Sequence, residues 1–309
     1  VAGAVSPDVA KSNAVGVATV DGTKATIELL DGILTLEGQT TYSGAAAAKL
    51  NGCLVTVSSY KRDYLTLSKV NGKGASTALN LTTNRMGTKE LSAGARFFEQ
   101  VSNGRLVEID RSDITITSIP ANKITYVGYD WAGRVDKLVL NDVTGDCYDY
   151  GMIYYRAAGY EESKDDGSEG SYQNGEIRVT NGSHTDGVSY VVGSVDGAKT
   201  NRMGGVAGSL DQLDGKNRMA AFMPLNEATG IRRAQFDTDA MLLTTNSMVI
   251  PISDKVECYN KTTGDWFKPG EDGDHKAALN LALAFSDDIT VYYDRSPEEG
   301  GKVRIVVVE

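Results

Sequence analysis

Two histidines are the residues of this chain best suited to acid–base chemistry, because imidazole is the side chain that titrates near neutral pH. His184 lies in the turn-rich segment 181–187, and His275 follows the acidic segment 271–274. The sequence has no Gly-x-Ser-x-Gly turn, no His-Glu-x-x-His motif and no phosphate-binding GxxxxGK[ST] loop. We therefore expect both histidines in turns or on the surface, and a hydrolase with a site spread over loops is the least favoured interpretation.

Acidic side chains gather in two loops, where carboxylate oxygens could bind a hard cation. Neither loop has the ligand spacing of an EF-hand, and the glycine and serine content of the first favours a solvated loop. We expect solvated loops, with weak calcium binding as the alternative and no other cofactor. The candidate calcium ligands are Asp165, Asp166 and Glu169 in the first loop and Glu271, Asp272 and Asp274 in the second.

Aromatic side chains form the other candidate site, because exposed rings can stack on sugar rings. The alternation of an extended strand would place Tyr148, Tyr150 and Tyr154 on one face. We expect these rings to cap a core while their hydroxyls reach water, with a carbohydrate-binding module as the alternative. The candidate glycan-contacting residues are Tyr148, Tyr150, Tyr154, Trp131 and Trp266.

Charge and composition limit the partners of the chain. Its 309 residues include 31 Lys and Arg against 41 Asp and Glu, a formal charge of −10, which argues against nucleic-acid binding. The longest apolar runs, 248–252 and 281–285, are far shorter than the roughly 18 residues of a membrane span. No leader precedes the globular sequence at Val1, so we expect a mature or excised segment.

The three cysteines, Cys53, Cys147 and Cys258, are widely spaced and form no CxxC pair. This pattern indicates neither a disulfide framework nor a zinc site. We expect buried or half-buried thiols, and a single bridge between two of them stays open.

An internal repeat organises the elements that must position these residues. Leu-Thr-Thr-Asn at 81–84 recurs at 243–246, Leu-Asn-Gly at 50–52 resembles Leu-Asp-Gly at 213–215, Asp-Gly at 21–22 resembles Asn-Gly at 181–182, and Tyr-Asp at 129–130 recurs at 293–294. The spacing stays between 160 and 164 residues. The repeat predicts two copies, 1–145 and 146–309, each with a further break near 76 and 236.

Each copy has the pattern of a β-module. Segments 54–57 and 64–67 predict a hairpin, and stronger hairpins, 123–128 with 135–140 and 288–293 with 303–308, close the two copies. The final run 305–308 is apolar without alternation, so both of its faces should be covered. Segment 275–285 fits a helix or a strand about equally well, and 45–49 fits one helical turn. The predicted fold is all-β, with tandem duplicated small barrels or sandwiches and few short helices.

Two of these segments resemble a known family. The ending DDITVYYDRSPEEGGKVRIVVVE at 287–309 resembles the C-terminal β-module region of cell-surface proteins of gut Firmicutes that carry S-layer homology domains, and LVLNDVTGDCYDYG at 138–151 resembles the joint between their β-modules. The S-layer homology module itself has no counterpart here. The resemblance implies an extracellular location at the bacterial cell surface.

We therefore expect a non-enzymatic structural segment of a bacterial surface-layer or envelope protein. Its partners would be further copies of itself or other cell-surface proteins, and its junctions would determine module spacing. A carbohydrate-binding adhesin that contacts cell-wall or host glycans is the alternative.

Overall fold

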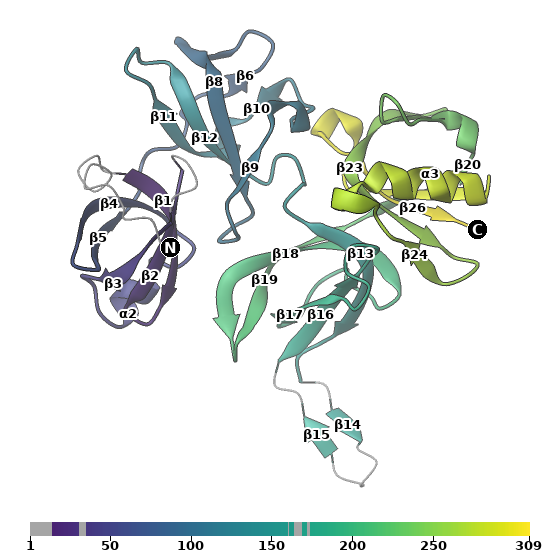
Figure 1. The fold of residues 1–309 in the computed structure, drawn as a ribbon, viewed down its shortest axis with the longest axis horizontal. Coiled ribbons are helices and arrows are strands. Elements are labelled where there is room, and N and C mark those ends of the chain that lie inside the picture. The colour runs from purple at the N-terminus through teal and green to yellow at the C-terminus, as the bar shows by residue number, and fades with distance from the viewer. Residues whose placement is uncertain (1–13, 31–34, 160, 164–168, 172–173) are drawn as a thin grey trace. The chain divides into compact units, whose positions relative to one another are not determined.

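The computed structural model describes residues 14–30, 35–159, 161–163, 169–171 and 174–309. In these residues the strands form two closed five-stranded barrels, two seven-stranded sheets and one two-stranded ribbon, and the α-helices are short (Figure 1). The predicted all-β class with tandem small modules is confirmed. No helix in the described part of the chain is long and apolar enough to cross a membrane.

The first barrel has the strand order β1-β2-β3-β5-β4. Antiparallel pairing of β1 with β4 and parallel pairing of β3 with β5 close this small barrel. Its core includes Ile27, Leu36 and Leu65, all nearly inaccessible to solvent. The elements are β1 Ala14–Asp21, β2 Lys24–Leu29, β3 Thr35–Thr40, α2 Ala45–Ala48, β4 Leu54–Lys61 and β5 Tyr64–Lys69.

The second barrel repeats this topology with the order β13-β16-β17-β19-β18. In both barrels the hairpin that joins the last two strands in sequence turns through two residues of positive φ, Arg62 and Asp63 in the first and Asp214 and Gly215 in the second. Such turns match the twist of the flanking strands. The elements are β13 Asp149–Arg156, β14 Glu161–Ser163, β15 Glu169–Ser171, β16 Gly175–Thr180, β17 Val188–Val192, β18 Arg202–Leu213 and β19 Lys216–Pro224.

The first sheet has the order β10-β6-β7-β8-β12-β11, with β9 paired to β8. The predicted closing hairpin is present as β11 and β12, and β12 runs parallel to the long strand β8. The strands are β6 Leu79–Asn80, β7 Arg85–Met86, β8 Lys89–Gln100, β9 Val107–Ile109, β10 Ser118–Ile119, β11 Ile124–Tyr129 and β12 Val135–Asn141, with 3₁₀ turns at Arg111–Asp113 and Ala121–Lys123.

The second sheet has the order β20-β25-β26-β23-β22-β21, with β24 paired to β23. The closing hairpin β25–β26 and the parallel β23–β26 pair correspond to those of the first sheet. The elements are β20 Asn226–Ile231, β21 Phe236–Asp237, β22 Leu242–Thr244, β23 Val249–Asn260, β24 Asp265–Phe267, α3 His275–Phe285, β25 Ile289–Tyr293 and β26 Val303–Val308, with 3₁₀ turns at Arg233–Gln235, Glu271–Gly273 and Pro297–Glu299.

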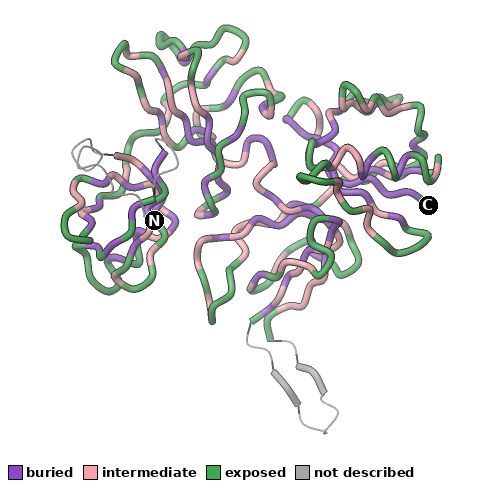
Figure 2. The backbone as a smooth tube through the Cα atoms, in the orientation of Figure 1, coloured by how far each residue is buried: buried purple, intermediate pink, exposed green. Residues whose placement is uncertain are grey.

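The final strand β26 is buried along its whole length (Figure 2). Burial on both faces agrees with the apolar run 305–308, and Arg304 is the one charged residue in the strand. The helix α3 packs on β23 and β26, which resolves the ambiguous segment 275–285 as a helix. Its buried face carries Ala278, Leu279, Ala282 and Leu283, the spacing of one helical stripe, whereas Leu281 is 58% exposed.

Two compact units are formed, one from residues 1–109, 118–141 and 209–212 and the other from 110–117, 142–208 and 213–309. Position 145 lies between β12 and β13, and position 76 lies between β5 and β6. Position 236 begins β21, inside the second sheet, because β20 already pairs with β25 and the barrel ends at Pro224.

Most of the short motifs that indicated the repeat occupy unlike positions. Leu81–Asn84 lie in the β6–β7 turn, whereas Leu243 and Thr244 belong to β22 and Asn246 to the next turn. In the second pair of motifs, Asn51 precedes β4, but Asp214 is in the β18–β19 hairpin. In the third pair, Gly22 lies in the β1–β2 turn, but Gly182 follows β16. The predicted match of Asn84 with Asn246 is therefore wrong.

The structural counterparts in the two sheets are offset differently. Asn80 ends β6 and its Oδ1 accepts hydrogen bonds from the amides of Thr82 and Thr83; Asp237 ends β21 and accepts in the same way from Asp239 and Ala240. Both hairpins then reach a residue of positive φ, Asn84 in one and Met241 in the other. The strand order thus reveals the duplication more clearly than the motifs do.

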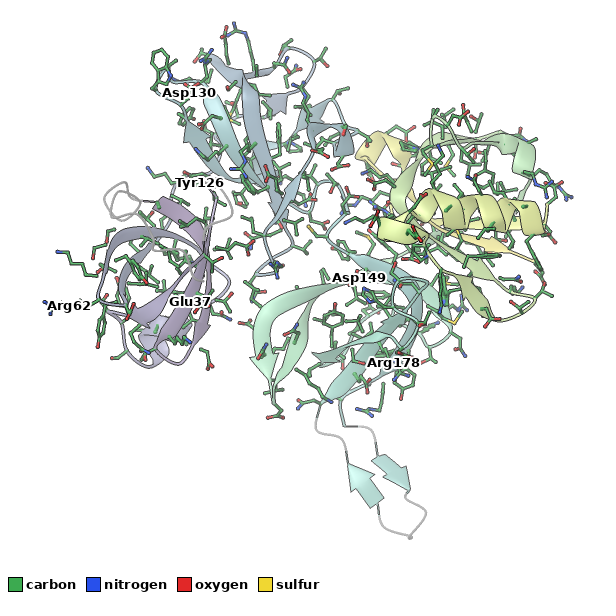
Figure 3. The ribbon with its side chains drawn as sticks, viewed as in Figure 1. Glu37, Arg62, Tyr126, Asp130, Asp149 and Arg178 are labelled. Atoms are coloured by element: carbon green, nitrogen blue, oxygen red, sulfur yellow. The ribbon has the colours of Figure 1, made fainter. Side chains whose placement is uncertain are left out.

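The match of Asp130 with Asp294 holds. Asp130 follows β11, and its Oδ1 accepts from the Arg134 amide at 2.9 Å, immediately before β12 (Figure 3). Asp294 follows β25, and its Oδ1 accepts from the Lys302 amide at 2.9 Å, immediately before β26. In both closing hairpins one aspartate fixes the start of the returning strand.

Candidate functional site

The segment 142–146, the first five residues of the connection from β12 to β13, is held in the second unit by side chains of the last hairpin. We call it the joint segment. Arg295, just after β25, donates from Nη1 to the Asp142 and Val143 carbonyl oxygens at 3.2 and 3.1 Å, and from Nη2 to Asp142 Oδ1 at 2.7 Å. One guanidinium therefore fixes both the backbone and the side chain at the start of the joint segment.

Arg304, in the middle of β26, holds the other end of the joint segment. Its Nη2 donates to the Thr144 carbonyl oxygen at 2.6 Å and to Asp294 Oδ2 at 3.1 Å, and its Nη1 donates to Asp146 Oδ1 at 2.7 Å. Lys302 Nζ adds bonds to both Asp146 oxygens at 3.2 and 3.1 Å. Each cation is thus matched by a carboxylate within hydrogen-bond distance.

We call these charged side chains the ion cluster: Arg295, Lys302, Arg304, Asp142, Asp146 and Asp294. Its central pair, Arg304 and Asp294, is buried. Arg304 is 2% exposed and Asp294 is 5% exposed. Burial alone lowers the pKa of Arg304, but Tyr150, Asp294 and Asp146 outweigh it and raise that pKa above the ordinary value, so the guanidinium stays charged. A buried charge is tolerated only when it is paired and hydrogen-bonded, so the cluster depends on every partner.

Two tyrosine hydroxyls also bond to the joint segment. The Tyr150 hydroxyl donates to the Gly145 carbonyl oxygen at 2.7 Å, and the Arg304 guanidinium lies 4.8 Å from the centre of its ring. The Tyr148 hydroxyl donates to Asp142 Oδ2 at 3.0 Å. Burial raises the pKa of both phenols, so they remain neutral donors.

Gly145 is required by this geometry. Its φ is +72°, and a Cβ at this position would collide with Asp294 Oδ2 and Arg304 Nη2. Glycine alone combines this left-handed conformation with the close approach of the ion cluster.

A polar cavity of about 220 Å³ lies beside the joint. Both histidines line it, with Asp149 at the start of β13 and Glu257 of β23 (Figure 3 labels Asp149). Glu257 is 5% exposed and accepts hydrogen bonds from Ser183 Oγ at 2.6 Å and the Gly182 amide at 3.0 Å. This carboxyl group therefore ties the loop after β16 to the second sheet.

The surroundings of Glu257 change its acidity. Burial raises the pKa of Glu257 to about 7, against the opposing effect of the hydrogen bonds from Ser183 and Gly182. His275 Nδ1 lies 3.0 Å from the Val256 carbonyl oxygen and 3.8 Å from Glu257 Oε1. His184 is exposed, in keeping with its turn. A protonated Glu257 could donate a proton, but both of its oxygens already accept hydrogen bonds from the 182–183 loop. We therefore assign Glu257 a structural role, which is to attach the second barrel to the second sheet.

The candidate calcium ligands that the structure describes, Glu271, Asp272 and Asp274, belong to no metal-binding group of side chains. No group of three or more His, Cys, Asp or Glu side chains arranged for a metal ion occurs in the described part of the chain. Asp274 instead caps α3, because its Oδ1 accepts from the Ala277 amide at 3.2 Å, while Glu271 and Asp272 form an exposed 3₁₀ turn. Asp165 and Asp166 lie outside the described residues, as does the side chain of Glu169 in β15.

The candidate glycan-contacting residues have different surroundings. Tyr148 and Tyr150 are buried in the joint, and Tyr154 on β13 packs under the Arg178 guanidinium, 4.7 Å from its ring centre (Figure 3 labels Arg178). Trp131 is 95% exposed at the tip of the β11–β12 hairpin, and Trp266 on β24 packs against Tyr259, with ring centres 4.9 Å apart.

No disulfide joins Cys53, Cys147 and Cys258, all of which lie in the described part of the chain. Cys258 on β23 is fully buried, and burial raises the pKa of its thiol. It therefore behaves as a small core residue.

The sequence reasoning missed Arg295, Lys302, Arg304 and Glu257. One signal could have identified Arg304, because it is a charged residue within the apolar run 303–308, and a charge inside a fully covered strand needs a partner. Its partner Asp146 is remote in sequence and carries no comparable signal.

The chain matches no protein-family model, no curated protein sequence and no solved structure at a significant level.

Proposed function

We propose that this chain is a non-enzymatic structural segment of a bacterial surface-layer or cell-envelope protein, located outside the cell. The observation that carries the proposal is the ion cluster around the joint segment. The joint segment lies within the stretch 138–151, which resembles the junction between β-modules of surface proteins. Each of its five residues is bonded by a side chain of the second unit.

The cluster supports a mechanical role because it replaces a flexible linker with a fixed one. Linkers rich in Gly and Ser are flexible and allow modules to move independently, whereas here Arg295 and Arg304 bind backbone carbonyl oxygens directly. Glu257 adds a second attachment between the second barrel and the second sheet. The barrel and the sheet would then act as one rigid spacer in a surface array.

The proposed partners are further copies of the chain or other cell-surface proteins. A charge of −10 opposes close approach of copies at low salt, and divalent cations would reduce that repulsion. The test is light scattering and electron microscopy of the chain at low ionic strength, with and without millimolar calcium chloride. We expect ordered assemblies when calcium is added, and a monomer at every salt, calcium and protein concentration would contradict self-assembly.

A further inference from the structure

A second cavity, of about 420 Å³, lies between the second barrel and the second sheet, within the second unit. We call it the Tyr259 groove. Met152 of β13 and Met203 of β18 line it from the barrel, and Val307 of β26 lines it from the sheet. Its volume is in the range of roughly 300 to 1,000 Å³ that small-molecule sites occupy.

Two half-buried tyrosine rings line the groove, Tyr259 on β23 and Tyr292 on β25. Trp266 packs against Tyr259 in a tilted arrangement, with 47° between the ring planes, which restricts the orientation of the Tyr259 side chain. The Tyr292 hydroxyl lies 3.4 Å from Glu227 Oε2 and donates to it. The groove therefore combines flat apolar faces with a fixed acceptor.

The edge of the groove carries hydrogen-bonding groups that the fold does not use. The side chains of Asn201 and Arg202 have no hydrogen-bond or ion-pair partner among the residues that the structure describes. The backbone holds Asn201 in place, because its φ is +64° and its amide donates to the Ile153 carbonyl oxygen at 2.8 Å. One amide and one guanidinium are thus available to a ligand.

The charges at the groove balance. Lys261 is paired with Glu309 at 3.1 Å, which leaves one cation, Arg202, and one carboxylate, Glu227. A neutral ligand that has apolar faces and several hydroxyl groups satisfies the rings, the donors and the acceptor together. We propose that the Tyr259 groove binds neutral sugar residues of a glycan. This proposal does not depend on the structural role of the chain.

Neutral sugars could come from bacterial walls or from host surfaces, so the test uses one probe of each kind. Binding of chitotriose and of desialylated mucin glycans to the full chain is measured by saturation-transfer NMR and titration calorimetry. We expect at least one probe to bind, and the probe that binds identifies the source. Absence of saturation transfer to both probes at millimolar concentration would overturn the proposal.

Variants locate the site. Arg202→Met removes a donor and Tyr259→Leu removes a ring, and each should weaken binding at least tenfold. Arg218→Met, on β19 of the same barrel but outside the groove lining, is the matched control and should bind as the unmodified chain does. Thermal unfolding confirms that each variant is folded. Unchanged binding by folded Arg202→Met and Tyr259→Leu would also overturn the proposal.

Discussion

Arg304 Nη2 lies 3.1 Å from Asp294 Oδ2 in a buried ion pair. The same aspartate accepts from the Lys302 amide through its other oxygen, so it fixes the start of β26 and orients the guanidinium that holds the joint segment. Asp130, its counterpart in the first sheet, bonds the half-exposed Arg134 instead. In the second copy, the aspartate of the closing hairpin therefore also orients the arginine that binds the joint segment.

Replacing Arg304 with methionine should destabilise the second unit strongly. The substitution leaves Asp146 and Asp294 without their guanidinium partner, and breaking a buried pair in this way costs about 3–5 kcal/mol. The measurement is urea unfolding followed by Trp266 fluorescence in a Trp131→Phe background. Lys261→Met, which removes the exposed pair with Glu309 in the same unit, should change stability by at most about 1 kcal/mol. Equal effects of the two substitutions would contradict a stabilising cluster.

Gly145→Ala should destabilise the chain more than Gly215→Ala. Both glycines have φ above +70°, so alanine at either position is strained by about 1–2 kcal/mol. A Cβ at Gly215 would meet open space, whereas at Gly145 it would collide with Asp294 and Arg304. The difference between the unfolding midpoints of the two variants therefore measures the cost of displacing the ion cluster. Identical midpoints would show that Asp294 and Arg304 can move away from the added Cβ without measurable cost.

Glu257 predicts a specific pH dependence. Its pKa is raised from 4.5 to about 7 in the folded chain, so the folded state binds the proton more tightly than the unfolded state does. The contribution of this group to the free energy of unfolding is therefore greatest below about pH 4.5 and falls as the pH rises to about 7.

Glu257→Gln keeps a neutral side chain at every pH and should remove that slope. Unfolding of both proteins is compared at pH 5, 6, 7 and 8, which cancels the effect of other titrating groups. We expect the stability of the variant relative to the unmodified chain to increase with pH. A relative stability that decreases with pH would show that the ionised carboxylate is the form that holds Gly182 and Ser183.

The sequence was sufficient for local β-structure but not for the long-range contacts. The hairpins β11–β12 and β25–β26 and the covered strand β26 follow from patterns within a few residues. The Leu-Thr-Thr-Asn motif misaligned the copies because the residue types that favour turns recur wherever a chain reverses. The true counterparts are Asn80 and Asp237, two different residue types whose side-chain oxygens accept the same backbone hydrogen bonds. The Arg304–Asp146 pair joins residues 158 positions apart, and no local pattern encodes such a contact.

Helix α3 shows the same limit. Leu279, Leu281 and Leu283 alternate as in a strand, but the packed residues are Ala278, Leu279, Ala282 and Leu283. The small alanines allow the helix to approach β23 and β26 closely, and this contribution is invisible when only large apolar residues are counted.

The central claim is that the second barrel and the second sheet form one mechanical unit through the joint segment. Single-molecule stretching of the full chain from its two ends tests this most directly. We predict that residues 142–309 unfold in one step, and that Arg295→Met with Arg304→Met divides this step into two. Two separate steps in the unmodified chain, one for the barrel and one for the sheet, would contradict the claim.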